Sequence, residues 1–175
     1  LNEIISIDFE LVIIAVPTKY HFNILKFLSN LKQLKVIICE KPFTNEYKKA
    51  NNIISLLKKK KKQVYVNYFR RWIPSFLKLN DYLNKYKVPK KMNVFYSKSL
   101  LRNGCHFIDF AHFLFGNVQF IKSDKIKKIL YLKSKNSFIT LNFLNKKRSE
   151  NFFEIIFEDK IILIDKQSKI YEKKN

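Results

Sequence analysis

The first 70 residues alternate short apolar runs with longer segments of helical periodicity, and this alternation restricts the fold more than any other feature. The apolar runs are Leu11–Val16, Lys35–Cys39 and Val64–Phe69. Between them, over 20–31 and 44–57, apolar residues recur every three or four positions, as on an amphipathic helix. Strands that alternate with helices indicate βαβ units, which form a parallel sheet with right-handed crossovers.

Three details of this segment can be predicted. Leu11–Val16 is apolar throughout, which is typical of a strand buried on both faces. Thr44 precedes the second helical stretch and is expected to cap it. The lysine run Lys58–Lys62 follows that stretch, and we interpret it as a solvated helix end whose cations face the negative pole of the helix dipole.

Beyond residue 70 the pattern changes. The spacing predicts a helix over Ser75–Tyr86, a strand over Lys91–Lys98 and an aromatic-rich helix over His106–Phe115, ended by Gly116. Further strand-like stretches are Val118–Ile121, Ile129–Leu132, Phe138–Leu144, Phe152–Phe157, Ile161–Ile164 and Ile170–Tyr171. Consecutive strands with short polar breaks indicate antiparallel hairpins. The expected organisation is an α/β segment (1–70) followed by an α+β domain (71–175).

The composition excludes several classes of protein. Hydrophobic residues make up 47% of the chain, so intrinsic disorder is not its main state. Only two glycines occur, and a complete GxGxxG fingerprint or Walker loop needs more than Gly104 and Gly116 offer. No apolar run approaches the length of a membrane span, and no signal peptide opens the sequence, so we expect no membrane partner. Cys39 and Cys105 are interpreted as small buried residues in a reducing, cytoplasmic compartment, with no metal site.

The formal charge of +21 favours nucleic-acid binding at first sight. Of the 35 basic residues, however, only four are Arg, the residue that reads guanine edges and clamps phosphates with two hydrogen bonds. We attribute the excess of Lys to A/T-rich codons and expect no nucleic-acid partner. The alternative of a non-catalytic basic module for nucleic acid or anionic surfaces is left open.

Four short motifs follow one another along the chain: AVPTKYH (15–21), CEKPF (39–43), NYFRRWIP (67–74) and NGCHFIDFAHFLFG (103–116). The first three begin at the carboxyl ends of predicted parallel strands, where ligands collect in open α/β sheets. Their polar residues should therefore converge on one crevice.

This ordered set resembles the glucose–fructose oxidoreductase/inositol dehydrogenase (Gfo/Idh/MocA) family, most specifically through Glu40-Lys41-Pro42, which matches the EKP signature of the family. The resemblance covers about residues 8 to 116. It implies a Rossmann cofactor domain followed by a mainly antiparallel sheet, and a dehydrogenase that uses NAD or NADP. It also implies a homo-oligomer formed through the C-terminal sheet. By the same resemblance, the glycine-rich N-terminal part of the cofactor domain, about sixty residues, is absent here.

The resemblance also assigns catalytic roles to two residues. Lys41 would contact both the nicotinamide and the substrate hydroxyl, and its bond to Pro42 is a candidate for the rare cis form. Gly104, His106 and Asp109 match the GxHxxD pattern of the family. Histidine changes its protonation near neutral pH, so His106 is suited to accept the carbinol proton while hydride leaves for nicotinamide.

The remaining predicted site residues fall into two groups. Cofactor-binding residues are expected to be Val16, Pro17, Thr18, His21, Glu40, Lys41 and Pro42. Substrate-binding residues are expected to be Arg70, Arg102 and Asn103, with no metal ligand.

One departure from the family concerns the substrate. Many members carry Asp four residues before the catalytic His, where this chain has Arg102. An Arg can pair with a carboxylate or phosphate, which favours an anionic sugar. Asn103 ahead of Gly104 is similar to family subgroups of surface-polysaccharide and nucleotide-sugar pathways. The expected function is thus hydride transfer between nicotinamide and a sugar, inositol-like or nucleotide-sugar carbinol. Arg102 and the missing segment leave open a degenerate, inactive member from a disrupted gene.

Overall fold

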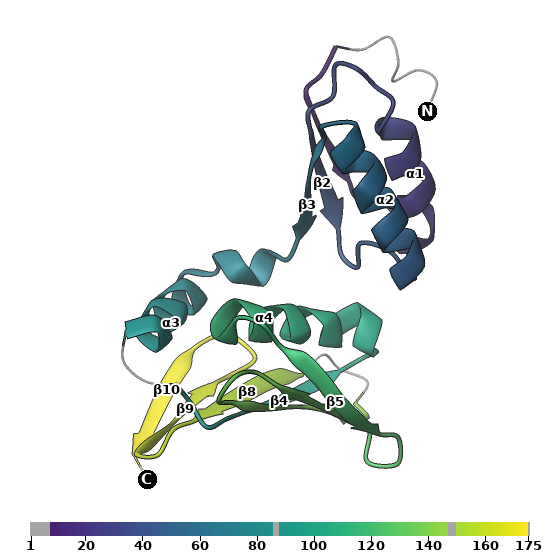
Figure 1. Cartoon of the computed structure of the whole chain (residues 1–175). Helices are drawn as coiled ribbons and strands as arrows, with labels where there is room; N and C mark the ends of the chain where they lie inside the picture. The colour runs from purple at the N-terminus through teal and green to yellow at the C-terminus, as the bar shows by residue number, and fades with distance from the viewer. Residues whose placement is uncertain (1–7, 86–87, 147–149, 175) are drawn as a thin grey trace. The chain divides into compact units, whose positions relative to one another are not determined.

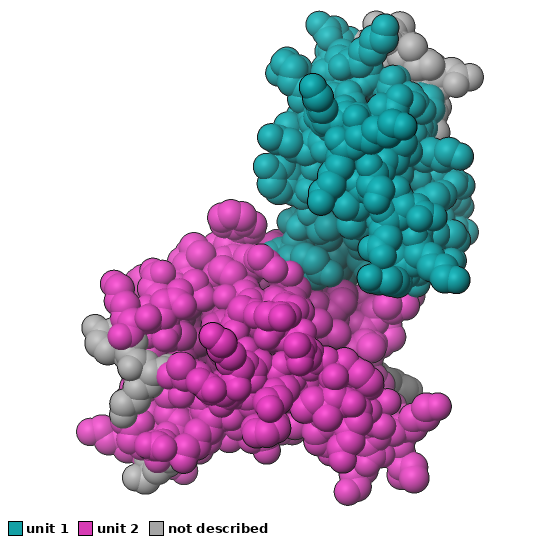
Figure 2. Space-filling model, in the orientation of Figure 1, with its two compact units in different colours: residues 1–68 teal, residues 69–175 magenta. Residues whose placement is uncertain are grey.

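The computed structural model describes residues 8–85, 88–146 and 150–174, and the chain divides into two compact units between Tyr68 and Phe69. Figure 2 colours unit 1 (residues 1–68) teal and unit 2 (residues 69–175) magenta. Each unit has a hydrophobic core of its own. Nine buried residues form the core of unit 1 and eighteen that of unit 2.

Unit 1 is a three-stranded parallel sheet with two helices (Figure 1). Its elements are β1 (Leu11–Ile14), a 3-10 helix (Thr18–Tyr20), α1 (His21–Leu28), β2 (Val36–Glu40), α2 (Tyr47–Lys59) and β3 (Gln63–Asn67). The strand order is β1-β2-β3, and Leu11 pairs with Val36, which in turn pairs with Gln63. The βαβαβ pattern predicted from the apolar runs is confirmed.

The prediction that the first strand is buried on both faces is wrong. Leu11 and Ile13 are 48% and 63% exposed, whereas Ile14 is buried. The reason is the topology, because two successive crossovers of the same hand place both helices on the same face of the sheet. Figure 1 shows α1 and α2 on one side of β2 and β3. The other face carries Tyr65, which is 57% exposed.

The predicted cap of the second helix is also wrong. The N-cap residue of α2 is Glu46, and no side chain caps the helix. The hydroxyl of Thr44 donates to the backbone oxygen of Glu46 at 2.8 Å, which is a local turn contact. It therefore does not cap the first N–H groups of the helix. At the other end, Lys58 and Lys59 occupy the last turn and are exposed, as the dipole argument predicts.

Unit 2 begins with two helices and then builds a seven-stranded sheet. Its elements are a 3-10 helix (Phe69–Trp72), α3 (Pro74–Lys85), β4 (Lys91–Ser97), a π-helical turn (Leu100–Gly104), α4 (Cys105–Phe115), β5 (Gln119–Asp124), β6 (Ile129–Lys133), β7 (Phe138–Leu144), β8 (Asn151–Ile156), β9 (Lys160–Ile164) and β10 (Ile170–Lys174). Tyr86, the expected last residue of the first helix, lies outside the described residues.

The sheet of unit 2 has the strand order β10-β9-β8-β4-β7-β6-β5. β4 is its central strand and pairs parallel with β7, while every other pair is antiparallel. The predicted hairpins and the mainly antiparallel character are confirmed. The parallel pair follows from α4, which provides the crossover that parallel neighbours need.

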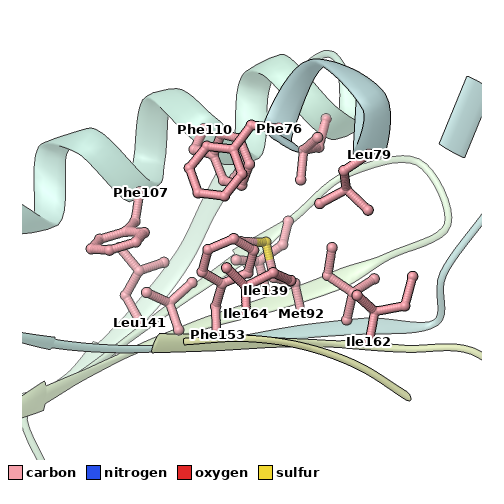
Figure 3. Close-up of a cluster of buried hydrophobic side chains, with 14 of the residues drawn as sticks. Phe76, Leu79, Met92, Phe107, Phe110, Ile139, Leu141, Phe153, Ile162 and Ile164 are labelled. Carbon is pink, nitrogen blue, oxygen red and sulfur yellow. The ribbon is translucent and has the colours of Figure 1, made fainter. Parts of the chain in front are cut away.

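Phenylalanine dominates the core of unit 2. Figure 3 shows Phe107 and Phe110 of α4, with Phe76 and Leu79 of α3, facing the aliphatic side chains of the sheet. The Phe110 ring lies 4.6 Å from Phe76 and 5.2 Å from Phe153, centroid to centroid. Rings at these distances add about 0.5–1.5 kcal/mol per pair beyond burial. This packing fixes α4 on the sheet and with it the position of His106.

Within the part of the chain that the structure describes, no helix is both long and apolar enough to span a membrane.

Candidate active site

In unit 1, the carboxyl ends of the three strands meet at one edge of the sheet. β1 leads into Val16, Pro17 and Thr18, β2 ends at Glu40, and β3 ends at Asn67. Glu40 and Asn67 are register partners, and the Asn67 amide donates to the Glu40 carboxylate at 2.6 Å. The carboxylate is thereby tied to the neighbouring strand. Asn67 has no role in the sequence-based prediction, although it opens the third motif.

Lys41 follows β2 directly and is joined to Pro42 by a cis peptide bond. Both residues are partly exposed, and Val16 on the loop after β1 is 40% exposed. The edge of the sheet therefore presents an ammonium group and an apolar side chain on neighbouring loops. Such an edge is the usual ligand-binding position of an open parallel sheet.

His21 begins α1 and is fully buried, with 0% exposure. Its Nε2 lies 2.8 Å from the oxygen of Val16, and its Nδ1 lies 3.1 Å from that of Pro42 and 3.2 Å from that of Phe43. The ring thus lies beneath the two loops and contacts their main chains. A histidine at this depth offers no surface for direct contact with a ligand.

Cys39 lies next to this histidine, with its Sγ 3.4 Å from Nδ1 of His21. Burial, and then the negative charge of Glu40, raise the pKa of the Cys39 thiol to about 12. The thiol is therefore protonated at neutral pH and acts as a small buried side chain, as its apolar sequence context predicts.

In unit 2, His106 lies in the first turn of α4 and is 5% exposed. The Phe69 ring packs edge-on against its imidazole, with the centroids 5.4 Å apart. Gly104 precedes it in the π-helical turn, and a Cβ at that position would come within 3.0 Å of the Tyr96 ring. Because Gly104 has no Cβ, this turn can pack closely on β4. The turn leads directly into α4, whose first turn carries His106.

Arg70 packs beside the same aromatic rings. Its guanidinium carbon lies 4.7 Å from the centroid of Phe107 and 5.9 Å from that of Phe69. Burial lowers the pKa of Arg70, although a guanidinium stays charged at neutral pH. Its Nε is buried and has no hydrogen-bond partner among the described residues. A buried N–H without an acceptor is costly, and an oxygen atom of a ligand would satisfy it.

Asp109, the third residue of the GxHxxD pattern, binds Arg71 through two hydrogen bonds. Arg71 Nε donates to Oδ2 at 2.8 Å, and a terminal nitrogen donates to Oδ1 at 2.5 Å. The Asp109 side chain is 11% exposed and that of Arg71 is 40% exposed, so the carboxylate is largely buried while the guanidinium is partly in solvent. It connects the 3-10 helix after residue 68 to α4, one turn after His106.

The two residues before Gly104 differ in exposure. Asn103 is 7% exposed, and its amide nitrogen donates to the oxygen of Ser97 at 3.0 Å and to Asn151 Oδ1 at 2.5 Å. Both amide hydrogens are therefore committed within the protein, and only its Oδ1 remains for a ligand. Arg102 is exposed, and its backbone N–H donates to the Ser99 hydroxyl.

Two cavities of unit 2 lie at the opposite end of α4. Cavities of about 450 and 590 Å³ surround Phe115 and Gly116 and share Ser134 and Lys135. His106 lies at the other terminus of the helix. We assign the candidate site to the end of α4 that carries His106, because His106 and Arg70 lie there in buried, aromatic surroundings.

Known proteins are similar to this chain in sequence. Residues 1–68 match the family described as "Oxidoreductase family, NAD-binding Rossmann fold" (Gfo/Idh/MocA). An uncharacterized oxidoreductase of Schizosaccharomyces pombe is 27% identical over 138 residues, which are 66% of this chain and 37% of that protein. This chain thus spans just over a third of that relative's length.

Solved structures share the fold of both units. The WlbA dehydrogenase of Chromobacterium violaceum, in complex with NADH and UDP-GlcNAcA, has a TM-score of 0.83 at 14% identity; all of this chain and 62% of that one are covered. KijD10, a 3-ketoreductase of Actinomadura kijaniata in complex with NADP, has a TM-score of 0.82 at 12% identity, with 100% and 64% covered.

The fold is a Rossmann-type parallel sheet followed by a mainly antiparallel sheet, an arrangement that these solved structures share. Residues 1–68, which make up unit 1, are thus similar to the NAD-binding part of the Gfo/Idh/MocA family.

Proposed function

We propose that the full-length protein containing this chain is an NAD(P)-dependent dehydrogenase that transfers a hydride between nicotinamide and a carbinol of a sugar, an inositol-like compound or a nucleotide sugar. The observation that carries the proposal is the position of Lys41. It lies at the carboxyl edge of a parallel sheet, inside the region that matches an NAD-binding family.

The residues at that edge fit the nicotinamide half of the cofactor. Val16, Pro17 and Thr18 supply an open, partly apolar loop, and Lys41 supplies a cation next to it. Glu40, already held by Asn67, accepts hydrogen bonds at the rim. When bound, the nicotinamide would accept the hydride that leaves the carbinol carbon.

The proton of the carbinol hydroxyl is assigned to Lys41 and His106. As the carbon–hydrogen bond breaks and the carbonyl forms, His106 would accept the hydroxyl proton, and Lys41 would contact the nicotinamide and the substrate hydroxyl, as the family resemblance implies. Phe69 against the imidazole limits its rotation and keeps water away from one edge. Asp109, which is paired with Arg71, holds the helix that carries His106.

Arg70 points to the class of substrate. Its buried Nε needs an oxygen acceptor, and a guanidinium binds carboxylate or phosphate better than a neutral hydroxyl. One structural neighbour is in complex with UDP-GlcNAcA, and another is a UDP-N-acetylglucosamine 3-dehydrogenase of Acidithiobacillus ferrooxidans. We therefore favour an anionic or nucleotide-linked sugar, in a pathway that builds surface polysaccharide. Arg102 and Asn103 Oδ1 are further candidates for substrate contact.

We also propose a homo-oligomer formed through the seven-stranded sheet. The face opposite α3 and α4 exposes aromatic side chains, among them Phe138 (57%) and Phe152 (37%), and Phe152 stacks on Phe95 at 4.6 Å. Phe95 and Phe152 are register partners, whereas Phe138 pairs with Lys91 at the other end of β4. Exposed apolar side chains on a sheet face favour association.

The test is a dehydrogenase assay of the full-length protein over a panel of neutral, anionic and nucleotide-linked sugars with NAD and NADP. Lys41→Ala and His106→Ala should each lower kcat about 100-fold to 10,000-fold. His112→Ala, at the exposed end of the same helix, and Lys48→Ala, on the surface of α2, are the matched controls and should keep wild-type turnover. Undiminished turnover in both Ala variants of Lys41 and His106 would refute these roles. Salt-sensitive DNA binding without cofactor affinity would instead favour the basic-module alternative.

A further inference from the structure

Lys41 lies between two segments of main chain that buried or paired side chains hold in place. On one side, Asn67 of β3 donates to the carboxylate of Glu40. On the other side, the His21 ring lies within hydrogen-bond distance of the oxygens of Pro42 and Phe43. Neither Asn67 nor His21 is needed for the chemistry proposed above, and His21 is too deeply buried to touch a ligand.

We propose that His21 and Asn67 are positioning residues that fix Lys41 by locking together the carboxyl ends of the three parallel strands. The locking itself follows from the contacts within unit 1. Its consequence for hydride transfer rests on the proposed dehydrogenase function.

His21 makes the first connection, between the loop after β1 and the loop after β2. Its Nε2 contacts the oxygen of Val16 at 2.8 Å, while Nδ1 faces the β2 side. A neutral ring that donates from Nε2 to Val16 can accept the thiol hydrogen of Cys39 at Nδ1. A ring with a hydrogen on each nitrogen donates to Pro42 and Phe43 instead. In the first form the imidazole joins the loop after β1 to Cys39 of β2, and in the second it joins that loop to the loop after β2.

Burial makes this connection strong. His21 is 0% exposed, so water does not reach the ring to replace a contact that it loses, and its contacts with the three carbonyl oxygens are partly buried. The ring also begins α1, which packs into the core of unit 1 through Leu25 and Leu28. His21 and α1 therefore anchor the two loops to the hydrophobic core of unit 1.

Asn67 makes the second connection, between β2 and β3. Its amide donates to Glu40 at 2.6 Å, and the two residues are paired in the sheet register. The main chain is thus held immediately before Lys41 by Asn67 and immediately after it by His21. A fixed main chain on both sides limits the positions that the Lys41 ammonium can take.

The experiment separates positioning from general stability. His21→Phe removes both ring nitrogens, and Asn67→Leu removes the amide at similar volume. Ile53→Val, on α2 in the same core, is the control, because it deletes one buried methyl group far from either loop contact. Hydrogen exchange by mass spectrometry on the whole 175-residue chain gives local opening. NADH affinity and the separate kcat and KM values come from the full-length protein.

We expect His21→Phe to speed amide exchange in segments 16–19 and 40–44 about tenfold. In Ile53→Val, the ratio of the exchange rates of these segments to those of α2 should equal the ratio in the wild type. His21→Phe and Asn67→Leu should lower kcat about tenfold or more, whereas Ile53→Val should not change it. His21→Gln, which can place its amide where Nε2 lies, should restore part of the loss. If His21→Phe does not fold, His21→Gln and Asn67→Leu carry the same comparison.

Two outcomes would overturn the inference: exchange in both segments that changes no more than in Ile53→Val, or a kcat unchanged in the folded His21 and Asn67 variants of an active enzyme. Failure of the proposed function looks different. In that case the wild-type protein binds no NADH, while the exchange difference between His21→Phe and Ile53→Val persists.

Discussion

Unit 1 and unit 2 both pack helices on one face of a sheet, but their hydrophobic cores differ in size. Unit 1 covers one face of a three-stranded sheet with two helices and buries nine core residues, mostly Leu and Ile. Unit 2 covers one face of a seven-stranded sheet and buries eighteen, among which the Phe153 ring contacts those of Phe76, Phe107 and Phe110.

The difference also extends to where the chemistry lies. In unit 1 the candidate residues lie at strand ends, on loops that side-chain hydrogen bonds must hold. In unit 2 His106 belongs to a helix that the phenylalanine core already holds. A small core thus relies on specific polar contacts for precision, and a large core relies on packing.

The largest effect is expected from Phe110→Ala. The substitution leaves a cavity among Phe76 and Phe153 and should cost about 3–5 kcal/mol of unfolding free energy. Because the cores are separate, hydrogen exchange should rise throughout unit 2 and stay unchanged in unit 1. Phe120→Ala, at a residue 63% exposed, is the control and should stay within about 0.5 kcal/mol. Equal loss of protection in both units would contradict the comparison.

A smaller loss is expected from Asp109→Asn. It removes the charge of a largely buried carboxylate that accepts two hydrogen bonds from Arg71, and it should cost about 1–3 kcal/mol in chemical denaturation. A double-mutant cycle with Arg71→Ala measures the coupling. If the two single effects simply add, the pair does not stabilise unit 2.

In unit 1, stability should fall at alkaline pH because of Cys39. Burial raises the pKa of its thiol from 9.0 to about 12, so between these values the unfolded chain loses a proton that the folded chain keeps. The stabilisation is complete below about pH 9 and declines as pH rises toward 12. Thermal unfolding of Cys39→Ala should show a shallower decline over this range than the wild type. A parallel decline in both proteins would show that other groups govern the alkaline limb.

The smallest effect is expected from Thr44→Ala. An N-cap Thr contributes typically about 1 kcal/mol, but Thr44 contacts only the oxygen of Glu46, so its loss should cost less than about 0.5 kcal/mol. Glu46→Ala provides the comparison at the true N-cap position. A loss of 1 kcal/mol or more for Thr44→Ala, measured by urea unfolding, would restore Thr44 as a cap.

Much of the fold follows from periodicity. The apolar runs and amphipathic spacings predict every strand and α-helix of the described residues to within a few positions, because burial of one face imposes a period of 2 or 3.6 residues. The motifs likewise identify Lys41 and His106 as candidates. Asn67 and Phe69 were missed as site residues, since an amide and an aromatic residue acquire a role only from the partner they meet.

The sequence by itself determined the order of elements, the change from parallel to antiparallel sheet and the resemblance carried by Glu40-Lys41-Pro42, because these depend on local spacing and residue type. Only the tertiary structure decided the burial of His21 beneath two loops, the pairing of Asp109 with Arg71 and the parallel alignment of β4 with β7. Apart from the contact of His21 with Val16, these contacts join residues 21 to 48 positions apart, and no local pattern records which distant partner a side chain will meet.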